Sequence, residues 1–290
     1  MNADVLPRVL VTGAEGLVGT AVVTALVSHG HPVTTLSRPD AAAHDDVRVV
    51  RGDATDPDAV REAVDGCDAV VHLAAYPNPW DHPAAEVFGN NTLATFATLW
   101  TAAEAGVRRF AVAGSVNATG LLMHPRKPLP ERLPIDERTP ARIADPYSLS
   151  KRVDEETLRA VCERFDASGV IFRLPLVVPP DRAEGLRAWV AERVADGPAE
   201  GWGWIDSRDA AEAFRLAITV PVEGAHVVQL AALTTMHDEP TEELIVRHAP
   251  GVERAREFAG TDAAVDVRRA RELLGFVPRF DRPGIVEEED

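Results

Sequence analysis

Short, continuously apolar runs alternate along the first 176 residues with longer segments in which apolar residues recur at helical spacing. The runs predict buried strands, and the periodic segments predict helices. The expected strands are 9–11, 31–36, 47–50, 68–73, 107–113 and 170–174, and the expected helices are 17–26, 56–66, 84–105 and 146–168. Strands that are apolar throughout and separated by helices are typical of a parallel sheet with both faces covered. The pattern therefore predicts an α/β protein with a doubly wound, parallel Rossmann sheet.

This alternation breaks after Leu176. Beyond it we expect a loop at 178–188, helices at 186–195, 207–219, 241–248 and 267–274, an extended segment at 201–205 and a strand at 225–230. We interpret residues 1–176 as a dinucleotide-binding domain and residues 177–290 as a small substrate-binding lobe, with the chain crossing between the two. Residues 40–46 and 121–145 are expected to be loops, and the tail after Arg282 is expected to fray.

Three glycines mark the turn between the first strand and the first helix: Gly13, Gly16 and Gly19, with the helix starting at Leu17. Such a turn aims free backbone N–H groups and the positive end of a helix dipole at one point, which suits a phosphate. The spacing is GxxGxxG rather than GxGxxG, so it meets the mechanism of the dinucleotide-binding fingerprint but not its usual spacing. The same glycines would also serve a turn that needs positive φ and binds nothing.

Tyr147 and Lys151 share one face of the helix predicted from Pro146, one turn apart. A lysine ammonium stabilises a nearby phenolate, which makes the tyrosine a usable acid/base near neutral pH, and the lysine could also hydrogen-bond a ribose. Ser115 follows the fifth strand, at the carboxyl end of the sheet, where its hydroxyl could donate to a substrate carbonyl oxygen. In isolation, an exposed Tyr–Lys pair and a plain loop serine would be the more common explanations of these residues.

Composition excludes several classes of partner. The net charge of −16 disfavours nucleic acid and anionic membranes. No apolar run reaches the ~18 residues of a membrane span, and residues 1–7 lack the features of a signal peptide, so we expect a cytoplasmic protein. Cys67 and Cys162 form no CxxC pair and are expected to be reduced thiols. No Cys, His or Asp constellation has metal-ligand spacing, so no metal is expected.

Several motifs occur together and in order: TGAEGLVG (12–19), GDATD (52–56), HLAA (72–75), NNTLAT (90–95), GSVNATG (114–120), YSLSK (147–151) and WIDSRDAAEAF (204–214). Over nearly its whole length the chain resembles the extended short-chain dehydrogenase/reductase superfamily. The resemblance implies an NAD(P)-dependent enzyme that dimerises through the helices at about 84–105 and 146–168.

The resemblance also implies roles for single residues. The catalytic set would be Asn91, Ser115, Tyr147 and Lys151, with Ser115 orienting the carbonyl, Tyr147 as acid/base and Lys151 on the nicotinamide ribose. Cofactor contacts would come from Gly13, Gly16, Leu17 and Gly19 at the pyrophosphate, Asp53 and Ala54 at the adenine, Leu73, Ala74 and Ala75 under the cofactor, and Leu174, Tyr147 and Lys151. Substrate contacts would come from Ser115, Val116, Asn117, Tyr147 and Arg182.

Departures from the superfamily pattern narrow the expected substrate. Val116 and Asn117 stand where nucleotide-sugar dehydratases carry an Asp-Glu pair, and Leu176 stands where nucleotide-sugar epimerases carry an Asn. Thr119 replaces an aromatic residue before Gly120. These departures disfavour a nucleotide sugar as the substrate. The loop is more similar to that of the hexuronate dehydrogenase group, whose members act on small free hydroxyl or carbonyl compounds.

The choice of cofactor depends on the end of the second strand. An acidic residue there selects NAD, whereas an arginine accommodates the 2′-phosphate of NADP. The sequence has Ser37 and Arg38 at this place, which predicts NADP(H). NAD is the alternative, because Asp40 could turn toward the ribose and Arg38 could be a solvated surface residue.

Other polar and aromatic residues have simpler interpretations. His72 is expected to be a core histidine, and Asp206, Arg208 and Asp209 are expected to form a helix start. Packing of the lobe is favoured over substrate lining for Trp202 and Trp204. Three arginines could meet a substrate carboxylate or phosphate: Arg173, Arg182 and Arg187.

Together these observations favour an NADP(H)-dependent oxidoreductase that interconverts a secondary alcohol and a ketone on a small polar substrate, with sugar derivatives among the candidates. Two alternatives stay open. One is an epimerase that transfers hydride transiently with tightly held NAD. The other is a catalytically silent NADP-binding sensor, which would have no need of an intact Ser115, Tyr147 and Lys151 set.

Overall fold

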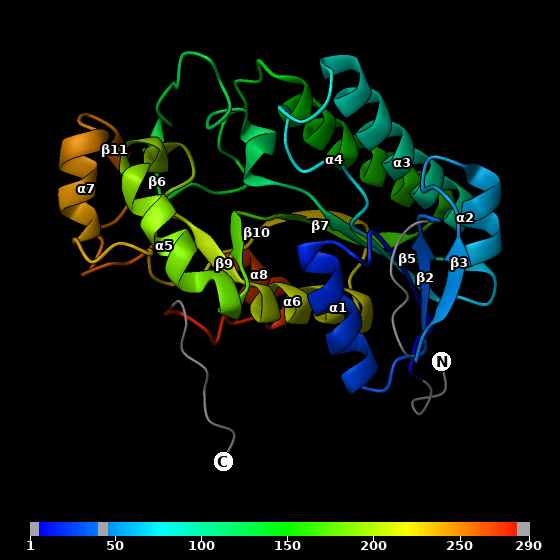
Figure 1. Ribbon diagram of the computed structural model, residues 1–290. Coiled ribbons are helices and arrows are strands. Elements are labelled where there is room, and N and C mark those ends of the chain that lie inside the picture. The colour runs from blue at the N-terminus through cyan, green and yellow to red at the C-terminus, as the bar shows by residue number, and fades with distance from the viewer. Residues whose placement is uncertain (1–5, 40–45, 283–290) are drawn as a thin grey trace.

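A computed structural model describes residues 6–39 and 46–282 and shows an α/β protein built on one large sheet (Figure 1). The sheet has seven parallel strands in the order β10-β7-β5-β4-β1-β2-β3. Their bounds are β1 Val9–Thr12, β2 Val33–Ser37, β3 Arg48–Arg51, β4 Ala69–His72, β5 Arg109–Ala113, β7 Ser168–Arg173 and β10 Ala225–Gln229. The doubly wound parallel sheet predicted from the sequence is therefore confirmed, with one strand more than the six expected.

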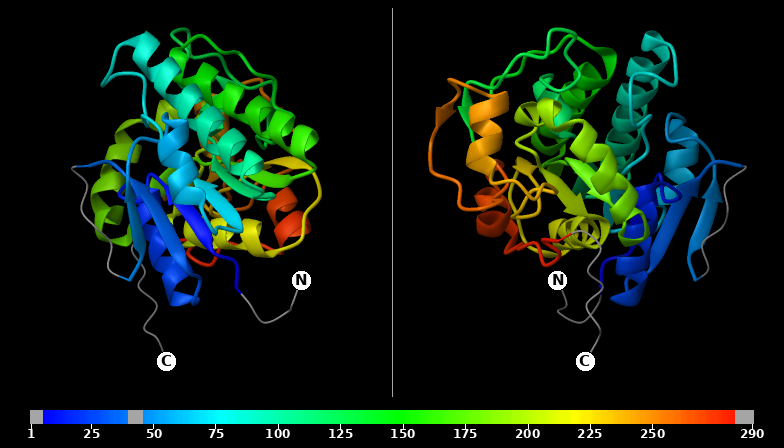
Figure 2. Two further views of the ribbon diagram at one scale, coloured as in Figure 1. Left: turned by 90° about the vertical axis from the view of Figure 1, so that its right-hand side faces the viewer. Right: turned by 60° about the vertical axis from the view of Figure 1, so that its left-hand side comes forward.

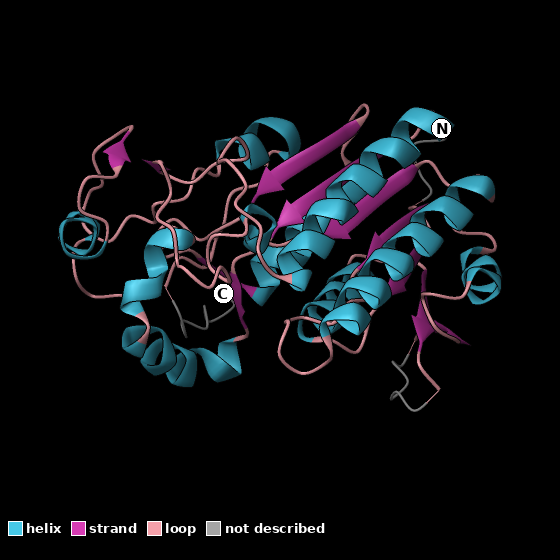
Figure 3. Cartoon of the chain, turned by 90° about the horizontal axis from the view of Figure 1, so that it is seen from above, coloured by secondary structure: helices cyan, strands magenta, loops and turns pink. Residues whose placement is uncertain are grey.

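Helices cover both faces of this sheet (Figure 1). One face carries α1 (Leu17–Ser28), α6 (Ser207–Thr219) and α8 (Arg268–Leu274), and the other carries α2 (Pro57–Val64), α3 (Ala84–Glu104) and α4 (Pro146–Phe165). Each face of the sheet has its own apolar core. Successive side chains of a strand point to opposite faces and pack against the helices there. Phe172 of β7 packs edge-on against Phe214 of α6, with 5.0 Å between ring centroids. In Figure 3, α3 and α4 run side by side across the strands.

A smaller unit lies beyond one end of the sheet and contains short elements (Figure 2). These elements are η1 Val116–Thr119, β6 Arg132–Leu133, β8 Leu176–Val178, η2 Pro180–Arg182, α5 Ala183–Glu192, η3 Val194–Ala199, β9 Trp204–Asp206, α7 Thr241–His248 and β11 Glu253–Arg254. Strand β8 pairs with β9, and β6 pairs with β11, both in parallel. Long-range pairing thus organises segments that have little regular structure of their own.

Three expectations about elements need correction. The strand expected at 225–230 is β10 and lies at the edge of the main sheet, because the chain crosses back into the larger unit through α6. Helix α5 begins at Ala183, inside the expected loop 178–188, because Ala183, Leu186 and Val190 form an apolar face against β8 and β9. The expected loop 121–145 contains β6. The division at residue 177 stays a prediction, and residues 40–45 and 283–290, including the tail expected to fray, lie outside the described residues.

Candidate active site at the carboxyl edge of the sheet

The turn after β1 contains two glycines, Gly13 and Gly19, that no other residue could replace without displacing the backbone. Gly13 has φ +69°, and a Cβ there would lie 2.7 Å from the backbone nitrogen of Ala74. A Cβ on Gly19 would lie 2.1 Å from the carbonyl oxygen of Gly13. Gly16 is the N-cap of α1, which has neither a side-chain cap nor an acidic residue in its first turn within the described chain. The exposed helix start therefore fits the pyrophosphate of a dinucleotide.

A buried polar chain fixes the neighbouring strand end. The hydroxyl of Thr12 lies 2.8 Å from Nδ1 of His72, and Nε2 of His72 lies 3.1 Å from the hydroxyl of Thr95 on α3. The Leu73 N–H donates to the Thr12 carbonyl at 3.1 Å. Burial, and secondarily the charge of Lys151, lowers the pKa of His72 to about 3. His72 is therefore neutral and structural, which confirms its interpretation as a core histidine.

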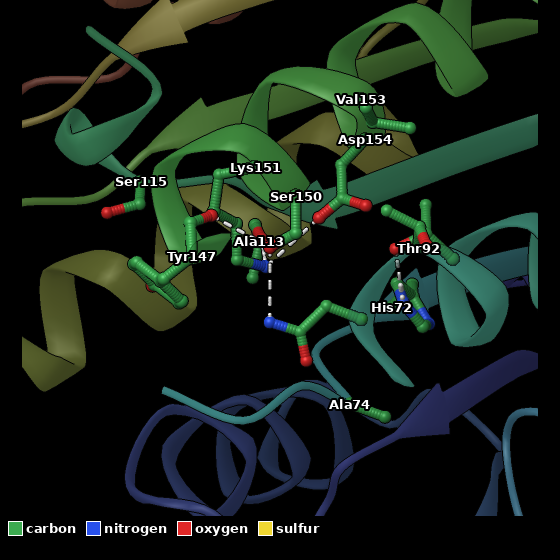
Figure 4. A network of polar contacts seen from close by, with 12 residues as sticks. His72, Ala74, Thr92, Ala113, Ser115, Tyr147, Ser150, Lys151, Val153 and Asp154 are labelled. Atoms are coloured by element: carbon green, nitrogen blue, oxygen red, sulfur yellow. Dashed lines mark hydrogen bonds and ion pairs between the residues drawn. The ribbon is translucent and has the colours of Figure 1, made fainter. Parts of the chain in front are cut away.

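Helix α4 presents Tyr147 and Lys151 one turn apart (Figure 4). Asp145 caps the helix by accepting the Ser148 N–H at 2.8 Å, and Pro146 occupies the first position. Both side chains are almost fully buried, with 7% of Tyr147 and 5% of Lys151 exposed. Nζ of Lys151 lies 5.9 Å from the centroid of the tyrosine ring. The structure therefore brings the predicted acid/base and its lysine together.

Two acceptors hold the lysine ammonium. Nζ of Lys151 donates to the carbonyl of Ala113 at 3.0 Å and to Oδ2 of Asp154 at 3.1 Å (Figure 4). Burial by itself would lower the pKa of Lys151, but Asp154 and, after it, Tyr147 together outweigh burial, so the pKa is raised. Asp154 is completely buried. The sequence analysis missed this aspartate, although its position three residues after Lys151 on one helix face signals an ion pair.

Ser115 lies at the end of β5, where its side chain caps η1. Its Oγ accepts hydrogen bonds from the backbone N–H of Asn117 at 3.1 Å and from Nδ2 of Asn117 at 3.3 Å. With both lone pairs used as acceptors, the hydroxyl hydrogen is left to donate elsewhere. The Val116 N–H donates to the Leu174 carbonyl at 3.0 Å, which ties this loop to the end of β7.

Asn91 is fully buried, and its described contacts are structural. Its Oδ1 accepts the Tyr76 N–H at 2.7 Å, and its Nδ2 donates to the Tyr76 carbonyl at 3.1 Å and to Oγ of Ser150 at 3.2 Å. Ser150 in turn donates to the Tyr147 carbonyl at 2.8 Å. Asn91 thus joins the segment after β4 to α4, and a direct part in catalysis stays a prediction.

The far end of the predicted cofactor site carries two arginines. Ser37 is buried at the end of β2, and the sheet register sets it beside Arg51 of β3. Arg51 donates to the carbonyl of Arg38 at 2.9 Å, so the two exposed arginines are neighbours. The place of Arg51 could not be predicted from the sequence, because only the pairing of β2 with β3 brings it next to Ser37. Asp53 accepts the backbone N–H and the hydroxyl of Thr55 next to Ala54, and Asp40 lies outside the described residues.

Two of the three arginines proposed to meet a substrate anion are already engaged. Arg173 is buried and donates to both oxygens of Glu155, at 2.7 and 3.2 Å. Arg187 forms an ion pair with Asp238. The prediction that these two bind a substrate anion is therefore wrong for Arg173 and disfavoured for Arg187. Arg182 is exposed in η2, and its role as a substrate contact stays a prediction.

The remaining polar candidates are structural, as expected. Asp206 caps α6 by accepting the Arg208 N–H at 2.8 Å, and Asp209 accepts the N–H groups of Arg279 and Phe280. Trp202 and Trp204 are buried in the smaller unit.

Cys67 and Cys162 are free thiols. Within residues 6–39 and 46–282, no group of three or more His, Cys, Asp or Glu residues could hold a metal, and no helix there is long and apolar enough to span a membrane.

A model of the NAD dependent epimerase/dehydratase family matches residues 9–231. The chain is 32% identical over 263 residues to a 2′-dehydrokanamycin reductase of Streptomyces kanamyceticus, a match that covers 84% of this chain and 67% of the relative. It is 27% identical over 190 residues to a uronate dehydrogenase of Pseudomonas syringae pv. tomato, covering 63% of this chain and 65% of that protein. Other curated relatives match over about a third of their own length.

Solved structures share the fold. A short-chain dehydrogenase/reductase superfamily protein from Agrobacterium tumefaciens with bound NAD superposes with a TM-score of 0.68 and 26% identity, covering 94% of this chain and 92% of that one. The glycine turn, the Tyr–Lys pair and these similarities point to the same kind of enzyme.

Proposed function

The chain belongs to the NAD dependent epimerase/dehydratase family and is an NAD(P)-dependent oxidoreductase, and from this premise we propose that it uses NADP(H) to interconvert a secondary alcohol and a ketone on a small, sugar-derived molecule. Two relatives are named for sugar-related substrates, a uronate and a dehydrokanamycin. The observation that carries the proposal is the juxtaposition of Ser115, Tyr147 and Lys151 at the sheet edge next to the turn at Gly13.

The side chains divide the chemistry among them. A bound nicotinamide dinucleotide supplies or accepts the hydride. The Ser115 hydroxyl donates to the carbonyl oxygen of the substrate and orients it. The Tyr147 hydroxyl delivers a proton to that oxygen during reduction and removes it during oxidation. The Lys151 ammonium, held by Ala113 and Asp154, would donate to a ribose hydroxyl of the bound dinucleotide.

NADP is favoured over NAD because Ser37 replaces a carboxylate, and because Arg38, directly after β2, lies next to Arg51 at the end of the neighbouring strand β3. Guanidinium groups pair well with a phosphate. We expect the double variant Arg38→Ala/Arg51→Ala to lose about 10-fold or more in kcat/KM for NADP, since a hydrogen bond to a charged group contributes about 1.5–3 kcal/mol. Kinetics with NAD in the same variant are the internal control and should change little. A wild-type preference for NAD would contradict the proposal.

The activity itself is tested by following reduced nicotinamide absorbance with a panel of ketoses, uronates and their lactones. Net oxidation or reduction of the cofactor supports an oxidoreductase. Cofactor that copurifies with the protein, together with substrate isomerisation and no net change in absorbance, would instead establish an epimerase.

A further inference from the structure

Tyr147 and Lys151 have a third ionisable neighbour on the same face of α4. Asp154 follows Lys151 by three residues and Tyr147 by seven, so the three side chains lie along one face of the helix over two turns. All three are buried, with 7% of Tyr147, 5% of Lys151 and none of Asp154 exposed. The proposed function gives Asp154 only the task of holding the lysine, although a buried charge also acts on every ionisable group close to it.

The ammonium of Lys151 lies between the phenol and the carboxylate (Figure 4). Nζ is 5.9 Å from the centroid of the Tyr147 ring and 3.1 Å from Oδ2 of Asp154. The carbonyl of Ala113 accepts a second N–H of the ammonium at 3.0 Å. Because an ammonium has three N–H groups, one is left for a ribose hydroxyl while the contact with Asp154 is kept. The ion pair is therefore compatible with a bound cofactor.

The other ionisable groups around this pair are neutral, paired or further away. His72 of β4 is neutral, because burial lowers its pKa to about 3. Glu155 of α4 is paired with Arg152 of the same helix and with Arg173 of β7. Asp145 is the N-cap of α4. The remaining ionisable side chains of α3, β5 and β10 lie near the ends of these elements: Glu86, Glu104, Arg109 and His226. Asp154 is therefore the acid that compensates Lys151.

The two charges act on the phenol in opposite directions. A positive charge near a phenol stabilises the phenolate, and a negative charge destabilises it. Lys151 alone would therefore draw the proton off Tyr147. With the Asp154 carboxylate within hydrogen-bond distance of the ammonium, the pair has no net charge, and most of the effect of the lysine on the phenol is cancelled. A carboxyl ionises at far lower pH than a phenol, so Asp154 is charged over the whole range in which a tyrosine titrates.

We propose that Asp154 offsets the charge of Lys151 and thereby keeps the proton on the Tyr147 hydroxyl, so that near neutral pH the free enzyme is in the form that reduces a ketone. The inference rests on the proposed oxidoreductase function, because it assigns the favoured direction of the reaction at the same site. In reduction, the carbonyl carbon takes a hydride from the reduced cofactor, and the carbonyl oxygen takes the proton of Tyr147. The phenolate left behind then takes a proton from water. Oxidation of an alcohol needs the phenolate at the start, and Asp154 disfavours that form.

The chain has two tyrosines, Tyr76 and Tyr147, which allows a direct test. In the full-length Tyr76→Phe protein, the near-ultraviolet absorbance of tyrosinate reports the ionisation of Tyr147 alone. Adding Asp154→Asn keeps the shape and a hydrogen-bond acceptor for Lys151 but removes the charge. We expect it to lower the pH midpoint of the titration by about 1 unit or more. Asp58→Asn, which removes an exposed acid that also forms an (i, i+3) pair, is the matched control and should leave the midpoint unchanged. Circular dichroism defines the pH range in which each variant is folded.

A second variant removes the pair as a unit. Lys151→Met/Asp154→Leu in the same background replaces both charges with apolar side chains, a change that buried ion pairs often tolerate. If the two charges cancel at the phenol, the midpoint should move much less than in Asp154→Asn. If the lysine dominates, the midpoint should rise by about 1 unit or more. Such a rise, or an unchanged or raised midpoint in Asp154→Asn, would overturn the inference.

The titration needs neither cofactor nor substrate, so it separates this inference from the proposed function. With activity in hand, the pH below which kcat/KM for alcohol oxidation falls should move to lower pH in Asp154→Asn, because less alkali is needed to form the base. The expected titration shift in a protein without dehydrogenase activity would refute the proposed function. Turnover together with an unchanged titration would refute the role of Asp154 alone.

Discussion

Lys151 depends on a buried counter-ion three residues further along its helix. Lys151 is 5% exposed, and its Nζ lies 3.1 Å from Oδ2 of Asp154, which is completely buried. A buried charge that loses its partner keeps its desolvation cost without compensation. We therefore expect Asp154 to be a positioning residue for Lys151, the lysine proposed to be catalytic.

We expect Asp154→Ala to lower the free energy of unfolding by about 3–5 kcal/mol, the usual cost of breaking a buried ion pair. Asp58→Ala is the matched control, because Asp58 also forms an (i, i+3) helix pair, with Arg61 at 2.7 Å, but in an exposed place. The control variant should lose about 1 kcal/mol or less in free energy of unfolding. Urea unfolding measures the free energy of unfolding of both variants. Similar losses in the two would contradict the claim that burial makes the Lys151–Asp154 pair more costly to break than an exposed pair.

The residues of the site differ in how far the sequence predicts them. Tyr147 and Lys151 are visible from spacing, because one helix face brings i and i+4 together. Arg173 was misread because its partner Glu155 lies on another element, 18 residues away in sequence. Arg51 was missed for the same reason, since its place beside Ser37 is a matter of strand register. Partners fixed by tertiary packing leave no local signal.

Among the elements, the β1–α1 turn carries a strict steric requirement set by its own backbone. The backbone of α1 approaches β1 so closely that a Cβ on Gly19 would lie 2.1 Å from the Gly13 carbonyl oxygen. With a Cβ at this position the turn must open, which would move the N–H groups that we propose to face the pyrophosphate.

Gly19→Ala should therefore weaken NADP binding by about 10-fold or more and lower the melting temperature. Gly89→Ala in α3 is the control, because a Cβ there meets nothing within 4 Å, and this change should stabilise the helix by about 0.5–1 kcal/mol. Calorimetric titration and thermal unfolding check the two effects. Unchanged binding in Gly19→Ala would refute the role of the turn.

Elements of the larger unit follow from periodicity, whereas those of the smaller unit follow from pairing. Strands such as β4 and β5 are largely apolar and buried along most of their length because helices cover both faces. The two-residue strands β6 and β11 form because they pair with each other, and no local sequence pattern predicts either of them. Helix α5 begins earlier than expected because its apolar face is set by β8 and β9.

At the scale of the whole molecule, large apolar side chains remain exposed along α3 and α4. Leu93 and Phe96 of α3 and Leu149 of α4 are 50%, 47% and 44% exposed, and the two helices lie side by side (Figure 2). An apolar face of this kind is typical of an interface. It supports the homodimer proposed from the resemblance.

Light scattering should give twice the chain mass of 31.2 kDa. Phe96→Asp should shift the protein to a monomer, because it places a charge in the apolar face. Val246→Asp serves as the control, since Val246 is 64% exposed on α7, away from α3 and α4. A monomeric wild type would contradict the proposed interface.

The central claim is that Tyr147 transfers the proton in a hydride-transfer reaction, and steady-state kinetics of Tyr147→Phe test it most directly. Tyr76→Phe, which alters the chain's other tyrosine, is the control. With the same substrate and NADP(H), we predict that kcat falls about 100-fold or more in Tyr147→Phe, as for loss of a general acid–base, while cofactor affinity stays within a few fold. Near wild-type turnover in Tyr147→Phe would contradict the account.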